Sequence, residues 1–547
     1  MMNRERRRLL WLAVLACAPL LCCVNSAYAQ LRIVTYNPTG APRTGMNMVL
    51  KSIGEELRNG FAKPIDVLLL QEQTRTASLP DTQAFVTLLN SIYADTGVTY
   101  ARGSVLGGGD STQTVVYRTN TVDLLSEVAV GTNGFSSQPR QTLRHKLRPV
   151  GYDDSAAFYI YNSHYKASQG TDPSAVLSNA DRRLAEATAI RTNSDALGNG
   201  AHAIYAGDHN FYDFDADEPA FGKLTSAGNG QAVDPINRVG TWHNNSSFAD
   251  VHTQSPTTTE RFTDQVTGGM DDRFDFQLVT SEFMDGEGLS YLSGSYHAFG
   301  NNGSTYNGNI DAAGNTYIMS GVTSYTKSQV LTALASVTDH LPVVADYQIP
   351  AKLGVELAAV PPVVTLGASI SLDVTVSNLA NVVAAIGADE LDYTLSVSGD
   401  LFGGASGVDL ALGGGNLHQV TLNTATPGLK SGVITLSSSS QGAANALQTF
   451  PINFEVASPF LAADFDEDGF VDGDDLATWQ TNFGLAVGAT KSVGDANLDG
   501  AVNGGDYLLW QQQYSVAAVS LASSSVPEPA AGAMLLLGMT LVMRRQR

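Results

Sequence analysis

Polar side chains that suit metal binding and proton transfer follow apolar segments at several places in residues 31–350. Residues 31–34 lead into Thr35-Tyr36-Asn37, and residues 67–70 lead directly into Gln71-Glu72. An amide and a carboxylate at the ends of neighbouring buried strands would lie at one edge, where they can hold a hard cation. Histidines and carboxylates, which suit acid-base chemistry, follow later apolar segments in the same way. The eight candidates, in chain order, are Asn37, Glu72, His164, Asp208, Asn210, Asp275, Asp339 and His340.

These side chains must be positioned by a large domain in which expected strands alternate with expected helices. Apolar and β-branched runs predict strands at 31–36, 67–71, 114–117, 157–163, 203–206, 274–279 and 343–347. Helical periodicity covers 46–58, 82–93 and 180–194. Residues 281–325 are rich in Gly, Asn, Ser and Tyr, which predicts a long loop or hairpin insertion over one rim. The pattern indicates one α/β or α+β domain over residues 30–350.

The ordered residues and their flanks resemble a known superfamily. The matching segments are Gln71-Glu72, Ser163-His164, Gly207-Asp208-His209-Asn210, Arg273-Phe274-Asp275-Phe276 and Thr338-Asp339-His340-Leu341-Pro342. Together they resemble the endonuclease/exonuclease/phosphatase (DNase I-like) superfamily over residues 31–348. The resemblance implies an α+β fold, a four-layer α/β-β/α sandwich with two packed sheets and helices outside. His209 departs from the family pattern and is expected to pack rather than reach substrate.

The resemblance also implies roles in phosphoester hydrolysis. Glu72 would be the principal ligand of Mg²⁺ or Mn²⁺, with Asn37 and Asp339 completing or supporting that shell. Asp208 would orient and deprotonate the attacking water, and Asn210 would position it or a phosphoryl oxygen. His340, oriented by Asp275, and His164 would stabilise the transition state or protonate the leaving group. Relatives contact phosphate where this chain has Tyr117 and Arg118, although a solvated arginine is almost as good an interpretation.

Residues 351–458 differ in composition from the preceding domain, because they contain many Val, Leu, Thr, Ser and Gly residues and almost no helical periodicity. Short strand candidates at 369–376, 391–397, 418–422, 432–437 and 449–455 are spaced as in an immunoglobulin-like β-sandwich. No cluster of ionisable groups appears there. The segment is therefore expected to act as a spacer, with a binding module as the alternative.

Residues 459–516 contain a repeat of two calcium-type loops, offset by 31 residues. Oxygen ligands at alternate positions can converge on one cation, and glycine at position six permits the sharp turn. A helix is expected after each loop, at 476–483 and 507–513. Two loop-helix units with Asp at position 12 resemble a type I dockerin, which implies Ca²⁺ and a cohesin-like partner, although a free-standing calcium-stabilised module also fits. The expected ligands are Asp464, Asp466, Asp468, Phe470, Asp472, Asp475, Asp495, Asn497, Asp499, Ala501, Asn503 and Asp506.

Both ends of the chain have the composition of targeting segments. In residues 1–29, arginines precede the apolar run 9–24 and Ala27-Tyr28-Ala29 follows, which predicts a signal peptide cleaved before Gln30. All three cysteines lie in that segment, so the processed chain would have neither disulfides nor Cys-bound metal. In residues 517–547, Pro527-Glu528-Pro529, an apolar stretch and terminal arginines resemble a PEP-CTERM sorting signal. This implies processing by an exosortase-type enzyme and a place at the bacterial cell surface or in the extracellular matrix.

Charge narrows the choice of substrate. The whole chain carries 31 basic and 53 acidic residues, for a net charge of −22. Residues 31–350 hold 21 basic and 33 acidic side chains, which argues against a broad nucleic-acid groove and a stable nucleic-acid complex. The leading hypothesis is a secreted metal-dependent phosphodiesterase, foremost an extracellular nuclease. The alternatives are a phospholipid or small-molecule phosphoesterase, and a non-catalytic matrix or scaffold protein with a vestigial enzyme fold.

Overall fold

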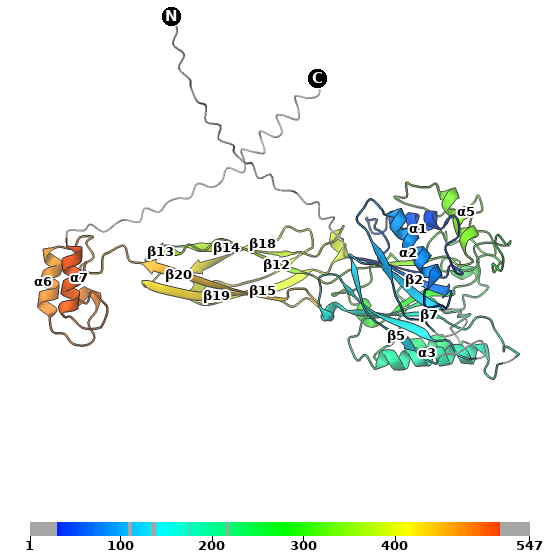
Figure 1. The fold of residues 1–547 in the computed structure, drawn as a ribbon, viewed down its shortest axis with the longest axis horizontal. Coiled ribbons are helices and arrows are strands. Elements are labelled where there is room, and N and C mark those ends of the chain that lie inside the picture. Colours follow the sequence, from blue (N-terminus) through cyan, green and yellow to red (C-terminus); the bar gives the residue numbers. More distant parts are fainter. Residues whose placement is uncertain (1–29, 108–111, 133–137, 174, 215–217, 515–547) are drawn as a thin grey trace, which may run out of the picture.

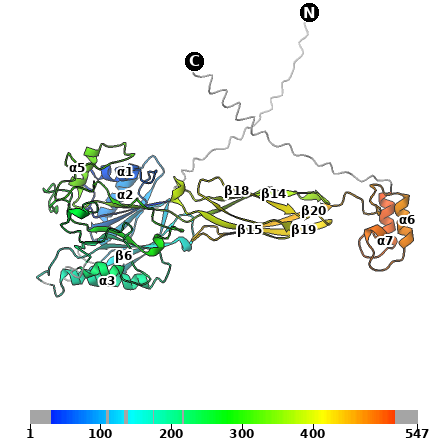
Figure 2. The same ribbon diagram turned by 180° about the vertical axis from the view of Figure 1, so that it is seen from behind.

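A computed structural model describes residues 30–107, 112–132, 138–173, 175–214 and 218–514. Figure 1 shows three parts along the long axis: a large α/β part, a β-sandwich, and two short helices at the far end. The view from behind in Figure 2 shows the same order. The expected signal peptide and PEP-CTERM segment lie outside the described residues. Within the described part, no helix is long and apolar enough to span a bilayer.

The first sheet of the large part has six strands, in the order β10-β11-β1-β2-β4-β3. β1 and β2 are parallel, whereas β11 and β4 run antiparallel to them. Helices α1, α2 and α5 cover the outer face, where their apolar side chains pack against Val34 and Leu68. The elements are β1 (Leu31–Tyr36), α1 (Met46–Glu55), β2 (Val67–Gln73), α2 (Pro80–Ile92), β3 (Tyr100–Arg102), β4 (Thr112–Arg118), β10 (His297–Ala298), α5 (Lys327–Val337) and β11 (Val343–Tyr347).

The second sheet has five strands, in the order β5-β6-β7-β8-β9. β7 and β8 are parallel, and β9 is antiparallel to β8. Helices α3 and α4 cover its outer face, packing around Tyr161 and Tyr205. The elements are β5 (Val122–Val130), β6 (Thr142–Pro149), β7 (Phe158–His164), α3 (Asn179–Asp195), β8 (Ala203–Asp208), α4 (Pro219–Thr225) and β9 (Asp275–Val279).

The inner faces of the two sheets pack together. Ile33 and Leu69 of the first sheet share a buried cluster with Ile160 and Ile204 of the second. Alternation along each strand sends the next residues to the helical layers, so β1, β2, β7 and β8 are buried on both faces. The result is a mixed α/β fold with helix, sheet, sheet and helix layers, consistent with the expected DNase I-like architecture.

The expected elements and the observed ones differ mainly in one hairpin. β5 and β6 are long strands, but their sequences are interrupted by charged residues such as Arg144 and Lys146, which hid them. Helix α1 ends at Glu55 rather than at Arg58. Residues 281–325 contain only the short 3-10 helix Ser281–Phe283 and the two-residue strand β10, so the expected long insertion is largely irregular backbone.

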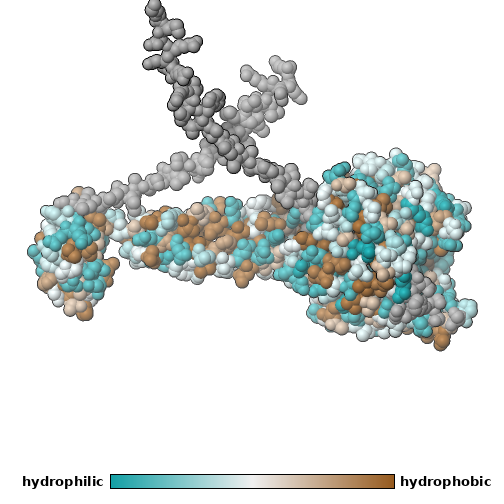
Figure 3. All heavy atoms as spheres, viewed as in Figure 1, coloured by the Kyte–Doolittle hydropathy of each residue, from teal (hydrophilic) through white to brown (hydrophobic). Residues whose placement is uncertain are grey.

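The middle part is a β-sandwich of a four-stranded sheet, β12-β14-β18-β16, and a five-stranded sheet, β13-β20-β19-β15-β17. Ala380 and Ala444, from loops at one end, join the buried cluster of the large part. Apolar residues spread along this part in Figure 3, and Leu429 and Leu447 are among the exposed ones. The strands are β12 (Leu353–Leu357), β13 (Val363–Thr365), β14 (Ser371–Asn378), β15 (Leu391–Gly399), β16 (Leu401–Phe402), β17 (Ala405–Asp409), β18 (Asn416–Leu422), β19 (Gly428–Ser438) and β20 (Leu447–Ala457).

The far end holds helices α6 (Gly473–Asn482) and α7 (Gly504–Gln513), each preceded by one expected calcium loop. Both helices begin earlier than expected because Asp472 and Asn503 form N-terminal capping boxes with Asp475 and Asp506. The core here is small, built from Phe465, Val471 and Trp510 with a few neighbours.

Candidate active site

The candidate residues meet at one edge because of strand direction. In the first sheet, the carboxyl ends of the parallel strands β1 and β2 face the beginning of the antiparallel strand β11, where Thr35 pairs with Val343. In the second sheet, His164 pairs with Asp208 and Asp208 pairs with Asp275. Asn37 and Glu72 from one sheet thus lie beside His164 and Asp208 from the other. Residues separated by about 300 positions in sequence share this edge.

His340 and Asp275 form a buried pair. His340 Nδ1 lies 2.7 Å from Asp275 Oδ2, and both side chains are almost fully enclosed. Burial alone would lower the pKa of His340, but the charges of Asp275 and Asp208 and the hydrogen bond to Asp275 raise it well above its usual value. These contacts favour the protonated imidazolium, with Nε2 directed away from Asp275 toward the site.

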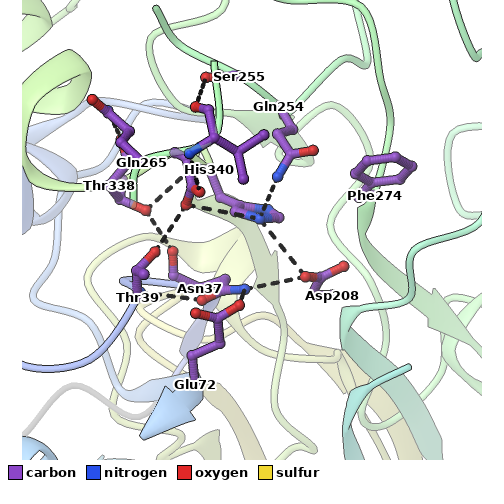
Figure 4. Close-up of polar contacts among 12 residues, drawn as sticks. Asn37, Thr39, Glu72, Asp208, Gln254, Ser255, Gln265, Phe274, Thr338 and His340 are labelled. Carbon is purple, nitrogen blue, oxygen red and sulfur yellow. Dashed lines mark hydrogen bonds and ion pairs between the residues drawn. The ribbon is translucent and has the colours of Figure 1, made fainter. Parts of the chain in front are cut away.

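Asp208 lies at the centre of the group. Its Oδ2 accepts a hydrogen bond from Asn37 Nδ2 at 3.1 Å and lies 3.5 Å from His164 Nε2 and 3.7 Å from His340 Nε2. Burial raises its pKa to about 7; the nearby charge of His340 opposes this shift, and the charges of Asp275 and Glu72 add to it. A carboxylate with a pKa near the working pH is suited to accept a proton in a reaction. Figure 4 shows Asp208 facing both Asn37 and His340.

Glu72 reaches the site through an irregularity in β2. The pairing of β2 with β4 shifts register between Leu70 and Gln73, and Glu72 has a left-handed backbone with φ 54°. Such a bulge redirects a side chain that regular pleating would send elsewhere. Glu72 Oε1 accepts a hydrogen bond from Asn37 Nδ2 at 3.1 Å and lies 3.7 Å from His164 Nε2. Asn37 thus holds Glu72 and Asp208 together.

The donor set at this edge fits a divalent metal ion. One ligand atom each from Glu72, His164 and Asp208 lies within 4.8 Å of the others. His164 has no hydrogen-bond partner at its buried Nδ1 among the described residues. Burial, with the positive charges of Arg140 and His340, lowers the pKa of His164 well below its usual value, so its imidazole is neutral. A neutral imidazole can donate a hydrogen bond to a phosphoryl oxygen, and the expected role of His164 in stabilising the transition state stays a prediction.

Asp339 and Asn210 are near the site but are committed to other contacts. Asp339 Oδ1 accepts from Thr39 Oγ1 at 2.8 Å and Oδ2 accepts from the Val266 amide at 3.0 Å. Asp339 is not in the three-residue group, and its expected role in completing or supporting a metal shell stays a prediction. Asn210 donates its Nδ2 to the Tyr165 carbonyl at 3.2 Å, and its backbone amide holds Asp208 Oδ1 at 3.1 Å.

Tyr117 and Arg118, the expected phosphate contacts, lie away from the other candidate residues. These residues end β4, which runs antiparallel to β2, so Tyr117 pairs with Val67 at the opposite end of the strand from Glu72. Arg118 is buried and lies 3.7 Å from Asp66, with its Nε 2.9 Å from Asn120. Because β4 runs antiparallel to β2, its last residues lie at the edge of the sheet opposite Glu72. The residues of β4 do not by themselves show this strand direction.

His209 packs, as expected. Its ring stacks on Tyr165 and Phe276 at centroid distances of 4.9 and 5.4 Å, and its exposure is 0%. Burial lowers its pKa to about 3, and neither ring nitrogen has a hydrogen-bond partner among the described residues. This neutral ring supports the backbone between Asp208 and Asn210.

Two residues near the site were not among the candidates. Arg140, just before β6, donates Nη1 to the Tyr165 carbonyl at 2.8 Å and to the His164 carbonyl at 3.4 Å, which places a half-buried cation beside the edge. Gln254 lies with its Nε2 2.9 Å from His340 Nε2 (Figure 4). Recognition of the β5–β6 hairpin would have pointed to Arg140. Gln254 lies in a loop with no periodic pattern, so nothing in the sequence marks it.

The calcium-type loops form compact turns at the far end of the molecule. Asp464, Asp466 and Asp468 bring one carboxylate oxygen each within 4.8 Å of the others. Asp464 Oδ1 is buried without a hydrogen-bond partner among the described residues, which a cation would satisfy. The position-12 carboxylates of both loops accept backbone amides instead, as with Asp472 N to Asp475 at 2.9 Å.

The second loop shows the same backbone arrangement with fewer charges. Asp495 accepts the amide of Gly500 at 2.8 Å, as Asp464 accepts that of Gly469 at 3.0 Å. Amide side chains at its third and ninth positions, Asn497 and Asn503, bond Asp499 Oδ2. The orientations of the Phe470 and Ala501 carbonyls toward an ion, and the choice of Ca²⁺, stay predictions.

No protein-family model matches the sequence, and no curated protein sequence matches it. Among solved structures, an endonuclease/exonuclease/phosphatase family protein from Bacteroides thetaiotaomicron is similar, with 12% identity, a TM-score of 0.33 and coverage of 58% of this chain and 97% of that one. A mannosyl-6-phosphatase from the same organism has 14% identity, a TM-score of 0.32 and coverage of 58% and 99%. D. rerio TDP2 in complex with single-strand DNA product has 14% identity, a TM-score of 0.33 and coverage of 58% and 99%. Each match covers nearly all of the solved chain and leaves much of this chain unmatched.

Proposed function

We propose that this chain is a secreted, metal-dependent phosphodiester hydrolase, foremost an extracellular nuclease. The observation that carries the proposal is the meeting of Asp208, with a pKa near 7, and the His340–Asp275 pair beside Glu72. Asp208 and His340 bring a proton acceptor and a proton donor to one edge, which suits general acid-base hydrolysis, in which water attacks phosphorus and an alcohol leaves.

Each side chain of the site has a separate role in the proposed reaction. Asp208 accepts the proton of the attacking water, whose oxygen forms the new bond to phosphorus. His340, kept protonated by Asp275, donates from Nε2 to the oxygen of the breaking ester bond. Asn37 holds Asp208 and Glu72 in place, and neutral His164 hydrogen-bonds a phosphoryl oxygen or completes the metal shell. Glu72, with His164 beside it, would hold Mg²⁺ or Mn²⁺, which when bound would neutralise charge on the phosphoryl oxygens, and Asp208 would stay free to accept the proton.

Arg140 supplies the local positive charge that the net composition lacks. Its Nη1 is fixed by two carbonyl oxygens of the segment that carries His164, and the residue is half-buried. A fixed cation at this edge suits contact with a phosphate. With 33 acidic against 21 basic side chains in residues 31–350, we expect transient binding of nucleic acid rather than a stable complex.

The same net negative charge favours a second candidate, a phospholipid or small-molecule phosphoesterase, because a short substrate needs no extended cationic groove. A panel of plasmid DNA, RNA, sphingomyelin and p-nitrophenyl phosphodiesters, each with Mg²⁺ or with EDTA, separates the two. Hydrolysis of the nucleic acids supports the nuclease, and hydrolysis of only lipid or small esters supports the alternative. Inactivity on all four, with the fold intact, would favour a non-catalytic scaffold.

The remaining parts of the chain are proposed to place the enzyme outside the cytoplasm. Residues 1–29 would direct export, and residues 517–547 would be processed by an exosortase-type enzyme at the surface or in the matrix. The two loops at 464–506 would bind Ca²⁺, and the dockerin-like segment would dock a cohesin-like partner or stand alone as a stabilised module. Intact mass spectrometry of the native protein tests the processing: a mature species that retains Arg547 would contradict it.

A further inference from the structure

A separate cavity lies between the segment after β7, the start of α3 and the loops that follow β8. Its volume is about 310 Å³, and its walls include Gln169, Arg183, Tyr212, Asp213, Glu218 and His243. Small-ligand sites run from about 300 to 1,000 Å³, so this cavity holds one ring-sized group rather than a nucleic-acid segment. None of its wall residues belongs to the hydrolytic group described above.

The cavity is near the edge of the two sheets that carries Asn37, Glu72, Asp208 and His340, which is called the catalytic edge. Tyr212 is two residues after Asn210, and its ring meets that of Phe274 at 5.0 Å, where Phe274 directly precedes Asp275. His243 Nδ1 bonds Asp272, and Gln254, which contacts His340 through its side chain, pairs with Asp272 through its backbone. The cavity wall is thus linked through Phe274 and Asp272 to the segments that carry Asp275 and contact His340.

The basic side chains of the wall already have polar partners. Arg183 Nε and Nη2 bind Glu218 at 2.6 to 2.9 Å, and Arg183 Nη1 binds the carbonyls of Lys166 and Ser168. The two ring nitrogens of His243 contact Asp272 and Asn244. A second phosphate would find no available positive charge here.

The remaining groups suit hydrogen-bond donors and the face of a ring. Asp213 Oδ1 accepts only the Phe214 amide, at 2.9 Å, and its Oδ2 has no hydrogen-bond partner among the described residues. The Tyr212 ring is held at steep angles by His243 and Phe274, while Arg183 lies 5.4 Å over it. The aromatic wall is thus rigid before any ligand enters, which lowers the entropy cost of binding.

We propose that this cavity is a specificity subsite that takes an uncharged ring with hydrogen-bond donors, carried on the scissile phosphate. Tyr212 and His243 contact the ring, and Asp213 accepts its donors. Both a nucleobase and a sugar have this chemistry. The role as a subsite rests on the proposed phosphodiesterase activity, but binding of the ring does not.

Binding to the full chain tests the cavity without turnover. Saturation-transfer NMR with adenosine and with methyl α-glucoside, as uncharged probes, should show one or both bound, and the arm that binds names the source of the ring. Tyr212→Ala should weaken that binding at least tenfold, and Asp213→Asn should weaken it several-fold. Tyr212→Phe should retain it, as should Tyr159→Ala, a half-buried tyrosine near the other end of β7. Failure of both probes to bind wild type, or equal binding by Tyr212→Ala, overturns the proposal.

A kinetic comparison links the cavity to the reaction. Between p-nitrophenyl esters of thymidine 5′-phosphate and of methyl phosphate, Tyr212→Ala should lower kcat/KM about tenfold for the nucleoside ester and under twofold for the methyl ester. An equal fall for both esters would indicate a structural role and contradict the subsite. Bound probe without hydrolysis of any ester would instead remove the proposed function and leave the cavity as a binding site.

Discussion

The catalytic edge and the calcium-type loops both gather carboxylates, but they do so over different lengths of chain. At the edge, partners such as Asn37 and Asp208 are 171 residues apart, and His340 and Asp275 are 65 apart. In each loop, all ligands lie within 12 consecutive residues. The first arrangement is imposed by two packed sheets, whereas the second is a local turn with little core behind it. We therefore expect the edge to keep its geometry without a metal ion, and the loops to need one.

Metal removal at the edge should have the largest effect. EDTA should abolish hydrolysis and Mg²⁺ or Mn²⁺ should restore it, because the charge on the phosphoryl oxygens would otherwise be uncompensated. Glu72→Gln should lose activity at saturating metal, and Glu356→Gln, in the β-sandwich, should not. The circular dichroism of the catalytic part should hardly change in EDTA. Full activity of Glu72→Gln would remove its assignment as a ligand.

Loss of the buried acid should be the next largest effect. His340→Ala should lower turnover about 10²- to 10⁴-fold, the usual contribution of general acid-base catalysis, and Asp275→Asn somewhat less. His418→Ala, in the β-sandwich, serves as the histidine control. Unchanged turnover in both catalytic variants, with folds verified by circular dichroism, would contradict the role of the pair.

Calcium should order the two loops and leave catalysis alone. Without the ion, carboxylates such as Asp464 and Asp466 repel one another across a small core, so Ca²⁺ binding and folding should be coupled. Calorimetry on the full chain should show two Ca²⁺ sites that Asp464→Asn together with Asp495→Asn removes. Hydrolysis in Mg²⁺ should change less than twofold in those variants. No calcium-dependent heat or spectral change would refute the loop assignment.

Acid should affect the two regions in opposite directions. Burial acts to raise the pKa of Glu56, but its hydrogen bond with His297 and the charges of His297 and Arg58 lower it to about 2. Its stabilisation is therefore complete above about pH 4.5 and is lost as pH falls through 2, by roughly 3 kcal/mol at about 1.4 kcal/mol per unit. In the ion-free loops, burial and the neighbouring charge raise the pKa of Asp464, so acid should favour the folded loops.

The measurement is the stability to unfolding in EDTA between pH 6 and pH 2. Separate spectroscopic signals should report the catalytic part and the loops. Glu56→Gln should show a smaller decline in the catalytic part than wild type does. A loop region that loses stability on mild acidification, in parallel with the catalytic part, would contradict the contrast.

The smallest effect is expected at Tyr117. Tyr117→Phe should change kcat/KM less than twofold, because the residue lies at the opposite edge of the sheet from Glu72. A large rise in KM with unchanged kcat would instead support a phosphate contact at Tyr117 and require a different substrate path.

The loops and the catalytic edge also differ in how well their residues can be predicted from the sequence. The loops could be identified from Asp464 to Asp475 because the required residues are consecutive. The edge could be identified from the order of its residues, since Glu72, Asp208 and His340 all lie at strand boundaries. The direction of β4 is not encoded locally, so the sequence did not show that Tyr117 lies at the other end of the sheet from Glu72. The charged residues of the β5–β6 hairpin likewise gave no sign of Arg140, which precedes β6. The cavity at Tyr212 and His243 depends on loop conformation, which no periodic pattern reports.

The catalytic edge also couples function to the packing of the two sheets. Asn37, Glu72 and His340 lie in or beside the strands of one sheet, and Asp208, His164 and Asp275 lie in the strands of the other. The contacts between the two sets are 2.7 to 3.7 Å long. A slide of about 1 Å between the sheets would break these contacts while leaving every strand intact, and misplacement of that size can cost about a hundredfold in rate. On heating, turnover should therefore fall before the protein unfolds, so turnover would report the alignment of the two sheets.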